Sequence, residues 1–180
     1  MEKDRDLRRT LVALLTAMAI LLHSLEAVLP SPLPWMRLGL ANILAVCTLV
    51  LFGPRAAFAL GLTRVLLGSL LIGTLFSPGF FLSLSGALCA TGLMSGLWLA
   101  GRRHFGPLGY SCIGAFGHVT GQLLAARLLL IPFDGLWRLL PLFGLLSLVT
   151  GVFNGIAADM LLLRLRKFEP LRRVSLEKHP

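Results

Sequence analysis

The chain has 180 residues, of which 56% are hydrophobic and 14% are charged, and its mean hydropathy is +0.84. Soluble domains carry about 25% charged residues, so this composition excludes an ordinary water-soluble domain and indicates a single integral membrane domain. The net charge of +9 does not indicate a nucleic-acid partner, because the basic residues lie between apolar segments and at the two ends of the chain.

Six apolar segments of about 20 residues follow one another, each long enough to cross a hydrocarbon core. Breaks containing Pro or Gly separate them. We therefore predict an all-α fold, a bundle of six transmembrane helices in one domain over residues 1–180, with a short N-terminus 1–8 and a basic tail 164–180. The spans are expected at residues 8–28, 36–53, 56–75, 79–100, 108–131 and 139–163.

The basic residues are distributed unequally between the two sides of such a bundle. Thirteen of the 17 Lys and Arg residues fall in the N-terminus, the second and fourth connections and the C-terminal tail. The opposite side carries only Arg37 and Arg138. The positive-inside rule then places both termini in the cytoplasm, which requires an even number of spans. We expect a multi-pass protein of the bacterial cytoplasmic membrane, surrounded by lipid.

The first two spans carry a small-residue pair and two polar groups. Ala13 and Ala17 are four residues apart, and such pairs make a flat surface against which another helix can pack. Arg37 lies near the expected outer surface, where its side chain can reach the headgroups. Asn42 lies about a turn and a half deeper and needs a partner. Glu26 is near the outer end of the first span, where water could solvate it.

Arg64 is the most informative residue of the third span. It lies near mid-membrane on one helical stripe with Ala57, Gly61 and Gly68, so it faces protein. Facing lipid there would cost at least about 2.5–3.5 kcal/mol, so an anionic or carbonyl partner is expected. That partner is either Asp159, Glu26 or backbone carbonyls in a structural role, or an anionic group of a bound substrate.

The stretch Ser111–Arg127 opposes a small and polar face to a bulky apolar face, which is typical of a membrane helix. His118 and Gln122 are four residues apart on the small face and therefore point into the protein. Val119 and Leu123 fall on the bulky face, together with Arg127, whose side chain is expected to reach the headgroups. The two inward polar residues either bond to a neighbouring helix or contact a ligand.

Polar residues thus gather toward the outer half of the bundle. We predict a ligand site there, open to the outside and covered by the uncharged segment 75–81. The last span carries a small-residue seam that includes Gly144, Ser147, Gly151 and Asn154. The candidate ligand-binding residues are Arg37, Asn42, Arg64, Ser83, Ser85, His118 and Gln122.

Enzyme chemistry finds little support. The chain has no DDxxD pair of aspartates to hold magnesium on a diphosphate, no HExxH or GxSxG motif and no Walker A loop. Cys47, Cys89 and Cys112 lie within apolar spans without metal-ligand spacing, so they are interpreted as packing residues. We expect neither a metal nor a cofactor, and no catalysis by this chain alone.

Four segments together resemble the "Gx transporter" family, also labelled heptaprenyl diphosphate synthase component I. They are Met36–Ile43, Arg64–Thr74, Ser83–Ala87 and Gly114–Gln122, and the resemblance runs over nearly the whole chain. Arg37 stands where many members are expected to carry lysine, and the positive charge is kept. The label of a synthase is hard to reconcile with a chain that lacks residues for prenyl transfer.

The family is similar to the substrate-binding S components of energy-coupling-factor (ECF) transporters. The resemblance implies six helices, a small molecule bound from the outer face, and docking of coupling and ATPase subunits through an AxxxA motif, which Ala13 and Ala17 match. The alternative that the family label implies is a membrane accessory subunit of an isoprenoid- or quinone-linked system. The identity of the small molecule does not follow from the residues.

Overall fold

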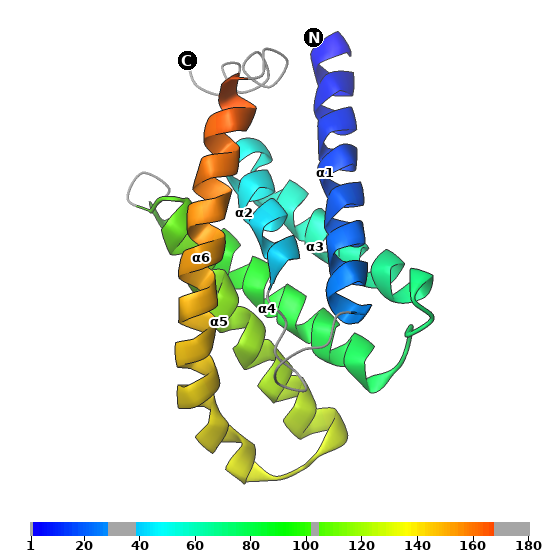
Figure 1. Cartoon of the computed structure of the whole chain (residues 1–180), viewed down its shortest axis with the longest axis vertical. Coiled ribbons are helices and arrows are strands. Elements are labelled where there is room, and N and C mark those ends of the chain that lie inside the picture. Colours follow the sequence, from blue (N-terminus) through cyan, green and yellow to red (C-terminus); the bar gives the residue numbers. More distant parts are fainter. Residues whose placement is uncertain (1, 29–38, 102–104, 168–180) are drawn as a thin grey trace.

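The computed structural model describes residues 2–28, 39–101 and 105–167, and all its regular elements are helical. Six α-helices follow one another along the chain, with a π-helix (η1) and a 3₁₀ helix (η2) before the last (Figure 1). Their bounds are α1 Glu2–Val28, α2 Leu40–Phe52, α3 Pro54–Leu71, α4 Pro78–Gly101, α5 Pro107–Ala125, η1 Ala126–Leu130, η2 Asp134–Leu139 and α6 Leu140–Lys167.

Among the described residues, five helical segments are long and apolar enough to cross a membrane, which confirms five of the six predicted spans. The sixth, α2, is an apolar helix of only 13 residues. At 1.5 Å per residue it is about 20 Å long, shorter than a hydrocarbon core of about 30 Å. The predicted second span began at residue 36, and residues 29–38 lie outside the described part of the chain.

The short helix α2 occupies the centre of the bundle. Ten of its 13 residues are buried, and it contacts the other five α-helices. An all-round apolar helix is expected in such a position. Gly53 connects it directly to α3, because its φ of 88° is accessible to glycine and Pro54 then opens the next helix.

Small residues set the packing of α5 between its neighbours α4 and α6. A Cβ atom on Gly121 would lie 2.5 Å from the backbone oxygen of Ser85 in α4, and one on Gly155 of α6 would lie 2.8 Å from the Cα of Leu108 in α5. Only glycine permits these distances. The inward small-residue faces predicted for the third, fifth and sixth spans are confirmed, since Gly61, Gly117 and Gly151 are likewise buried.

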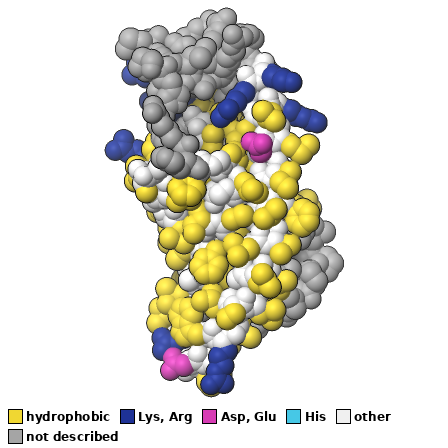
Figure 2. Space-filling view, turned by 90° about the vertical axis from the view of Figure 1, so that its left-hand side faces the viewer, with side chains coloured by type: hydrophobic (Ala, Val, Ile, Leu, Met, Phe, Trp, Pro, Cys, Tyr) yellow, Lys and Arg dark blue, Asp and Glu magenta, His cyan; other side chains and the backbone are white. Residues whose placement is uncertain are grey.

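The surface between the two ends of the molecule is apolar. Figure 2 shows hydrophobic side chains over the middle of one face, with Lys and Arg side chains at both ends. Among the large apolar residues, Leu21, Leu71 and Phe153 are each more than 60% exposed. The start of α1 and the end of α6 lie at the same end of the bundle (Figure 1). This surface is that of a multi-pass membrane protein.

Candidate functional site

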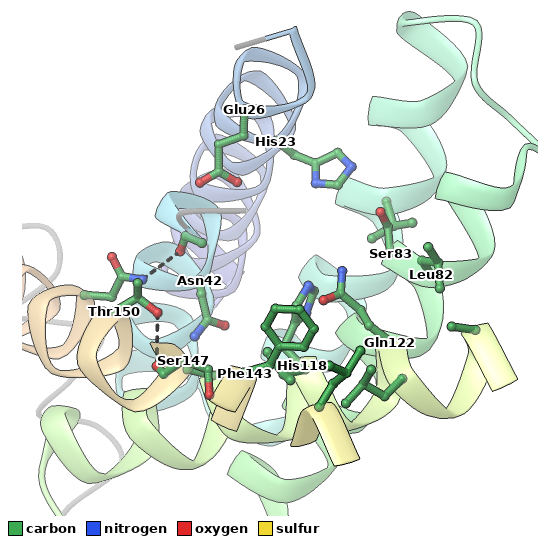
Figure 3. A pocket seen from close by; sticks show the side chains of 18 of the residues that line it. His23, Glu26, Asn42, Leu82, Ser83, His118, Gln122, Phe143, Ser147 and Thr150 are labelled. Atoms are coloured by element: carbon green, nitrogen blue, oxygen red, sulfur yellow. Dashed lines mark hydrogen bonds between the residues drawn. The ribbon is translucent and has the colours of Figure 1, made fainter. Parts of the chain in front are cut away.

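A cavity of about 140 Å³ lies in the half of the bundle away from the start of α1, and residues of all six α-helices line it (Figure 3). Its apolar lining includes Val65, Leu82, Val119, Leu123, Leu130, Ile131, Leu136, Leu139 and Phe143. Its polar lining comprises His23, Glu26, Asn42, Arg64, Ser83, His118, Gln122, Ser147, Thr150 and Asn154. A largely apolar cavity with a few convergent polar groups is typical of a small-molecule site.

The structure brings together five of the seven residues predicted to bind a ligand. Asn42, Arg64, Ser83, His118 and Gln122 line the cavity from four different helices. The side chains of Asn42, Arg64 and Ser83 are at most 7% exposed, whereas those of His118 and Gln122 are half-buried. Residues separated by up to 80 positions in the chain therefore share one site.

The remaining two predicted residues are placed differently. Arg37 lies outside the described residues. Ser85 does not line the cavity: its hydroxyl donates to the carbonyl of Leu82 at 3.1 Å, and its backbone lies against Gly121 of α5. The reason is helical geometry, because residues two apart on a helix point in different directions. Ser83 faces the cavity, so Ser85 faces α5.

Two glycines make room for the histidines of the site. A Cβ on Gly68 of α3 would lie 2.7 Å from the ring of His23, and a Cβ on Gly86 of α4 would lie 2.8 Å from the ring of His118. Real Cβ atoms do not approach so closely, so each imidazole rests against a bare stretch of backbone. The glycines therefore fix how far each ring reaches into the cavity.

Two carboxylates were considered as structural partners of Arg64, and only one of them is at the cavity. Glu26 lines it, and its Oε1 accepts a hydrogen bond from the backbone N–H of Leu40. A carboxylate at the first turn of a helix is favoured by the helix dipole. Asp159 is exposed on α6 and does not line the cavity, where Arg64 is buried. Of the two carboxylates named as alternatives, Glu26 is therefore the one that shares the cavity with Arg64.

Sequence reasoning missed the polar side of α6. Ser147, Thr150 and Asn154 line the cavity, and the amide of Asn154 donates to the carbonyl of Gly39 at 3.3 Å. Ser147 and Asn154 were interpreted as part of a packing seam with the glycines. Ser147, Thr150 and Asn154 are spaced by three and four residues, which places all three on one face of the helix. This spacing is the signal that could have identified them as part of a site.

The segment that closes the cavity near η1 and η2 is not the segment predicted to cover it. Segment 75–81 does not line the cavity, since Phe80 is buried against Val65 and Ala87 and holds the segment on α3 and α4. Residues of the connection between α5 and α6 line it instead, including Leu130, Ile131 and Leu136. Val119 and Leu123, predicted to face lipid, border the cavity as well.

The connection is tied together by an ion pair. Arg127 Nε donates to Asp134 Oδ1 at 2.7 Å, joining the π-helix η1 to the first residue of the 3₁₀ helix η2. Arg127, whose side chain was expected to reach the headgroups, thus has a protein partner at this end of the molecule. Both side chains are exposed at this end of the molecule.

In the described part of the chain, no group of three or more His, Cys, Asp or Glu residues could hold a metal ion.

The chain was compared with known protein families. The family model described as heptaprenyl diphosphate synthase component I matches residues 15–161. The chain belongs to the heptaprenyl diphosphate synthase component I family. No curated protein matches the chain, and no solved structure matches it either.

The match to the component I family includes every residue that lines the cavity, since these residues run from His23 to Asn154. Ala17 also lies within it, and Ala13 precedes it by two residues. The family that the sequence resembled is thus confirmed. Its description names a prenyl diphosphate synthase, whose reaction needs groups that hold magnesium on a diphosphate, and the cavity presents one carboxylate, Glu26.

Proposed function

We propose that this protein resembles an ECF S component and binds a small molecule at its outer face for uptake, with energy supplied by partner subunits. The observation that carries the proposal is the cavity. Polar side chains of all six helices converge on about 140 Å³ inside a bundle whose surface is apolar. Buried polar groups within a membrane are costly and are typical of substrate sites.

The size of the cavity limits the ligand. An engineered protein cavity of about 150 Å³ holds one benzene molecule, so this cavity suits a ligand of roughly that size. Arg64 offers a planar guanidinium that can hold a carboxylate or phosphate through two hydrogen bonds. Arg64, His118 and Gln122 would bind an anionic or strongly polar end of the molecule, and the apolar wall would enclose its body.

Docking of partners is proposed to use α1. Ala13 and Ala17 are both exposed, as are the neighbouring Leu14 and Met18. Small residues four apart allow a second helix to approach closely. ECF-type coupling and ATPase subunits are the expected partners, because this chain has no ATP-binding motif of its own.

The orientation follows from charge. With the start of α1 and the end of α6 at one end of the bundle, the basic termini would face the cytoplasm. The cavity lies in the other half, toward the outer face. The bacterial cytoplasmic membrane is the location that fits this arrangement.

The alternative function is an accessory subunit of an isoprenoid- or quinone-linked enzyme, which the family description favours. Such a subunit would associate with a soluble prenyl synthase. The cavity is far too small to enclose a chain of seven isoprene units, so any prenyl chain would have to lie on the apolar outer surface. Prenyl binding would then be insensitive to Arg64.

Purification from a native membrane separates the two functions. Recovery of coupling and ATPase subunits, together with a small molecule retained in native mass spectrometry, is the expected result. The retained molecule should be lost from Arg64→Ala. Recovery of a soluble prenyl synthase in place of those subunits, with no retained small molecule, would reject the uptake function.

A further inference from the structure

One side of the cavity carries three side-chain oxygens that can still accept a hydrogen bond. Ser147 and Thr150 of α6 lie beside Asn42 of α2 on this side (Figure 3). The hydroxyl of Ser147 donates to the carbonyl of Gly144 at 2.8 Å, and that of Thr150 donates to the carbonyl of Ser147 at 3.0 Å. A hydroxyl has one hydrogen and two lone pairs, so both groups have only acceptor capacity left for a ligand.

Asn42 adds a third acceptor. Its side chain is 7% exposed, and its Oδ1 atom is buried without a hydrogen-bond donor in the described part of the chain. A buried polar atom without a partner is rare in folded proteins and calls for an explanation. The side chain borders the cavity, so a donor on a bound molecule would satisfy it.

The position of Asn42 is fixed by its surroundings. Its backbone N–H donates to the carbonyl of Gly39 at 2.8 Å, and that same carbonyl receives the amide of Asn154. The Asn42 amide also lies 3.4 Å from the place that a Cβ on Gly114 of α5 would occupy. The acceptor group is therefore held between three helices before any ligand arrives.

Charged and titratable side chains surround the cavity. Glu26 lies above Asn42 and Thr150 in Figure 3, and the backbone N–H of Leu40 holds its carboxylate at the start of α2. Arg64, His23 and His118 come from α3, α1 and α5. Phe143 is one turn before Ser147 and borders the same space. An aromatic face and a carboxylate both attract a cation.

We propose that the surface formed by Asn42, Ser147 and Thr150 binds a protonated amine, so that the ligand of this site is a small organic amine. An ammonium group has three donors and no acceptor, which matches three oxygen acceptors. The proposal rests on the proposed function and names a second end of the ligand, in addition to the polar end at Arg64. The apolar body would pack on the wall that includes Phe143 and Val119.

Benzylamine and benzyl alcohol test the proposal, because they share one skeleton and differ in the ammonium group. Affinity is measured for the purified full chain in detergent, in buffer without added salt. Benzylamine should bind at least about tenfold more tightly than benzyl alcohol, equivalent to 1.4 kcal/mol. Asn42→Leu should abolish this preference and leave the melting temperature of the ligand-free protein equal or higher, because it removes an unsatisfied buried oxygen.

Thr48→Val is the matched control. Thr48 is on the same helix, is fully buried, and also has an unsatisfied hydroxyl oxygen, but it does not line the cavity. This variant should keep the amine preference. Asn42→Leu with a lowered melting temperature and an unchanged preference would show a structural asparagine and overturn the proposal.

Two further outcomes are decisive. If sodium chloride alone displaces benzylamine, and Asn42→Leu abolishes that effect, the oxygens form an inorganic cation site and the amine proposal falls. If native mass spectrometry finds a retained small molecule without an amine, this proposal falls while the uptake function stands. If no molecule is retained and neither probe binds, both fall.

Discussion

The position of His118 can be perturbed without touching any residue of the cavity. Gly86 lies on α4, and a Cβ atom added there would be 2.8 Å from both Cε1 and Nδ1 of His118 and 3.0 Å from Nε2. Carbon atoms in contact are normally about 3.5–4.0 Å apart. In Gly86→Ala the ring must therefore move by roughly 0.7 Å or more, and the cavity is the space open to it.

The size of the effect follows from two opposing terms. Overpacking of a close-packed site costs about 1–3 kcal/mol, and replacing glycine by alanine within a helix returns about 0.5–1 kcal/mol. We expect Gly86→Ala to lower the free energy of unfolding by about 1–2 kcal/mol. Because the displaced ring enters a cavity of about 140 Å³, retention of the bound small molecule should also fall.

Gly92 offers a control on the same helix. It is exposed, and no atom lies within 4 Å of the place of its Cβ, so Gly92→Ala should be neutral or slightly stabilising. Thermal unfolding in detergent gives the stability of both variants, and native mass spectrometry gives the retained ligand. Equal melting temperatures and equal retention for Gly86→Ala and Gly92→Ala would refute the reasoning.

Three further predictions concern the proposed function. Arg64→Lys should weaken ligand binding, because the planar fork of the guanidinium is lost, and Arg64→Ala should weaken it more. If Arg64→Ala instead binds the ligand with normal affinity, and adding Glu26→Gln restores its stability, Arg64 forms a structural ion pair. A cysteine at Asp134, in a background free of the native cysteines, should react with an impermeant reagent from the outside only, and labelling from the cytoplasm only would reverse the orientation. The double variant Ala13→Trp, Ala17→Trp should insert normally and retain ligand but lose its partner subunits, whereas unchanged association would remove α1 as the docking surface.

Local periodicity was sufficient to predict which face of a helix is inward. On α3, the stripe of Ala57, Gly61, Arg64 and Gly68 is entirely buried, as expected. This succeeds because the angle between residues on a helix is fixed by the backbone and does not depend on the rest of the fold. The same reasoning placed His118 and Gln122 inward on α5, but it also placed Val119 and Leu123 toward lipid, and both border the cavity.

Long-range placement was not accessible in this way. Whether an inward residue meets a cavity or a neighbouring helix depends on the axial shift between helices, which no local pattern records. Ser147 and Gly151 illustrate the point, because both face inward on α6 but only Ser147 lines the cavity. The wall that includes Leu130 and Ile131 was missed for another reason. Leu130 belongs to the π-helix η1 and Ile131 comes directly after it, and a π-helix breaks the regular periodicity of an α-helix.

A pair of small residues on a helix shows that another helix could pack closely there. It does not show whether that helix belongs to the same chain or to a partner. Gly92 and Gly96 on α4 are exposed and have open space around them, in contrast to Gly117 and Gly121 on α5. The exposed pairs, Ala13 with Ala17 and Gly92 with Gly96, belong to the half of the bundle where α1 begins and α4 ends.

The two kinds of surface are therefore separated along the bundle. The cavity takes its residues from the end of α1, the start of α2 and the start of α4, whereas the exposed small pairs lie toward the opposite end of α1 and α4. A partner helix that covered those pairs would leave the cavity accessible from the other face. For the S-component function this separation is necessary, because the protein must bind its ligand on one side while partner subunits act from the other.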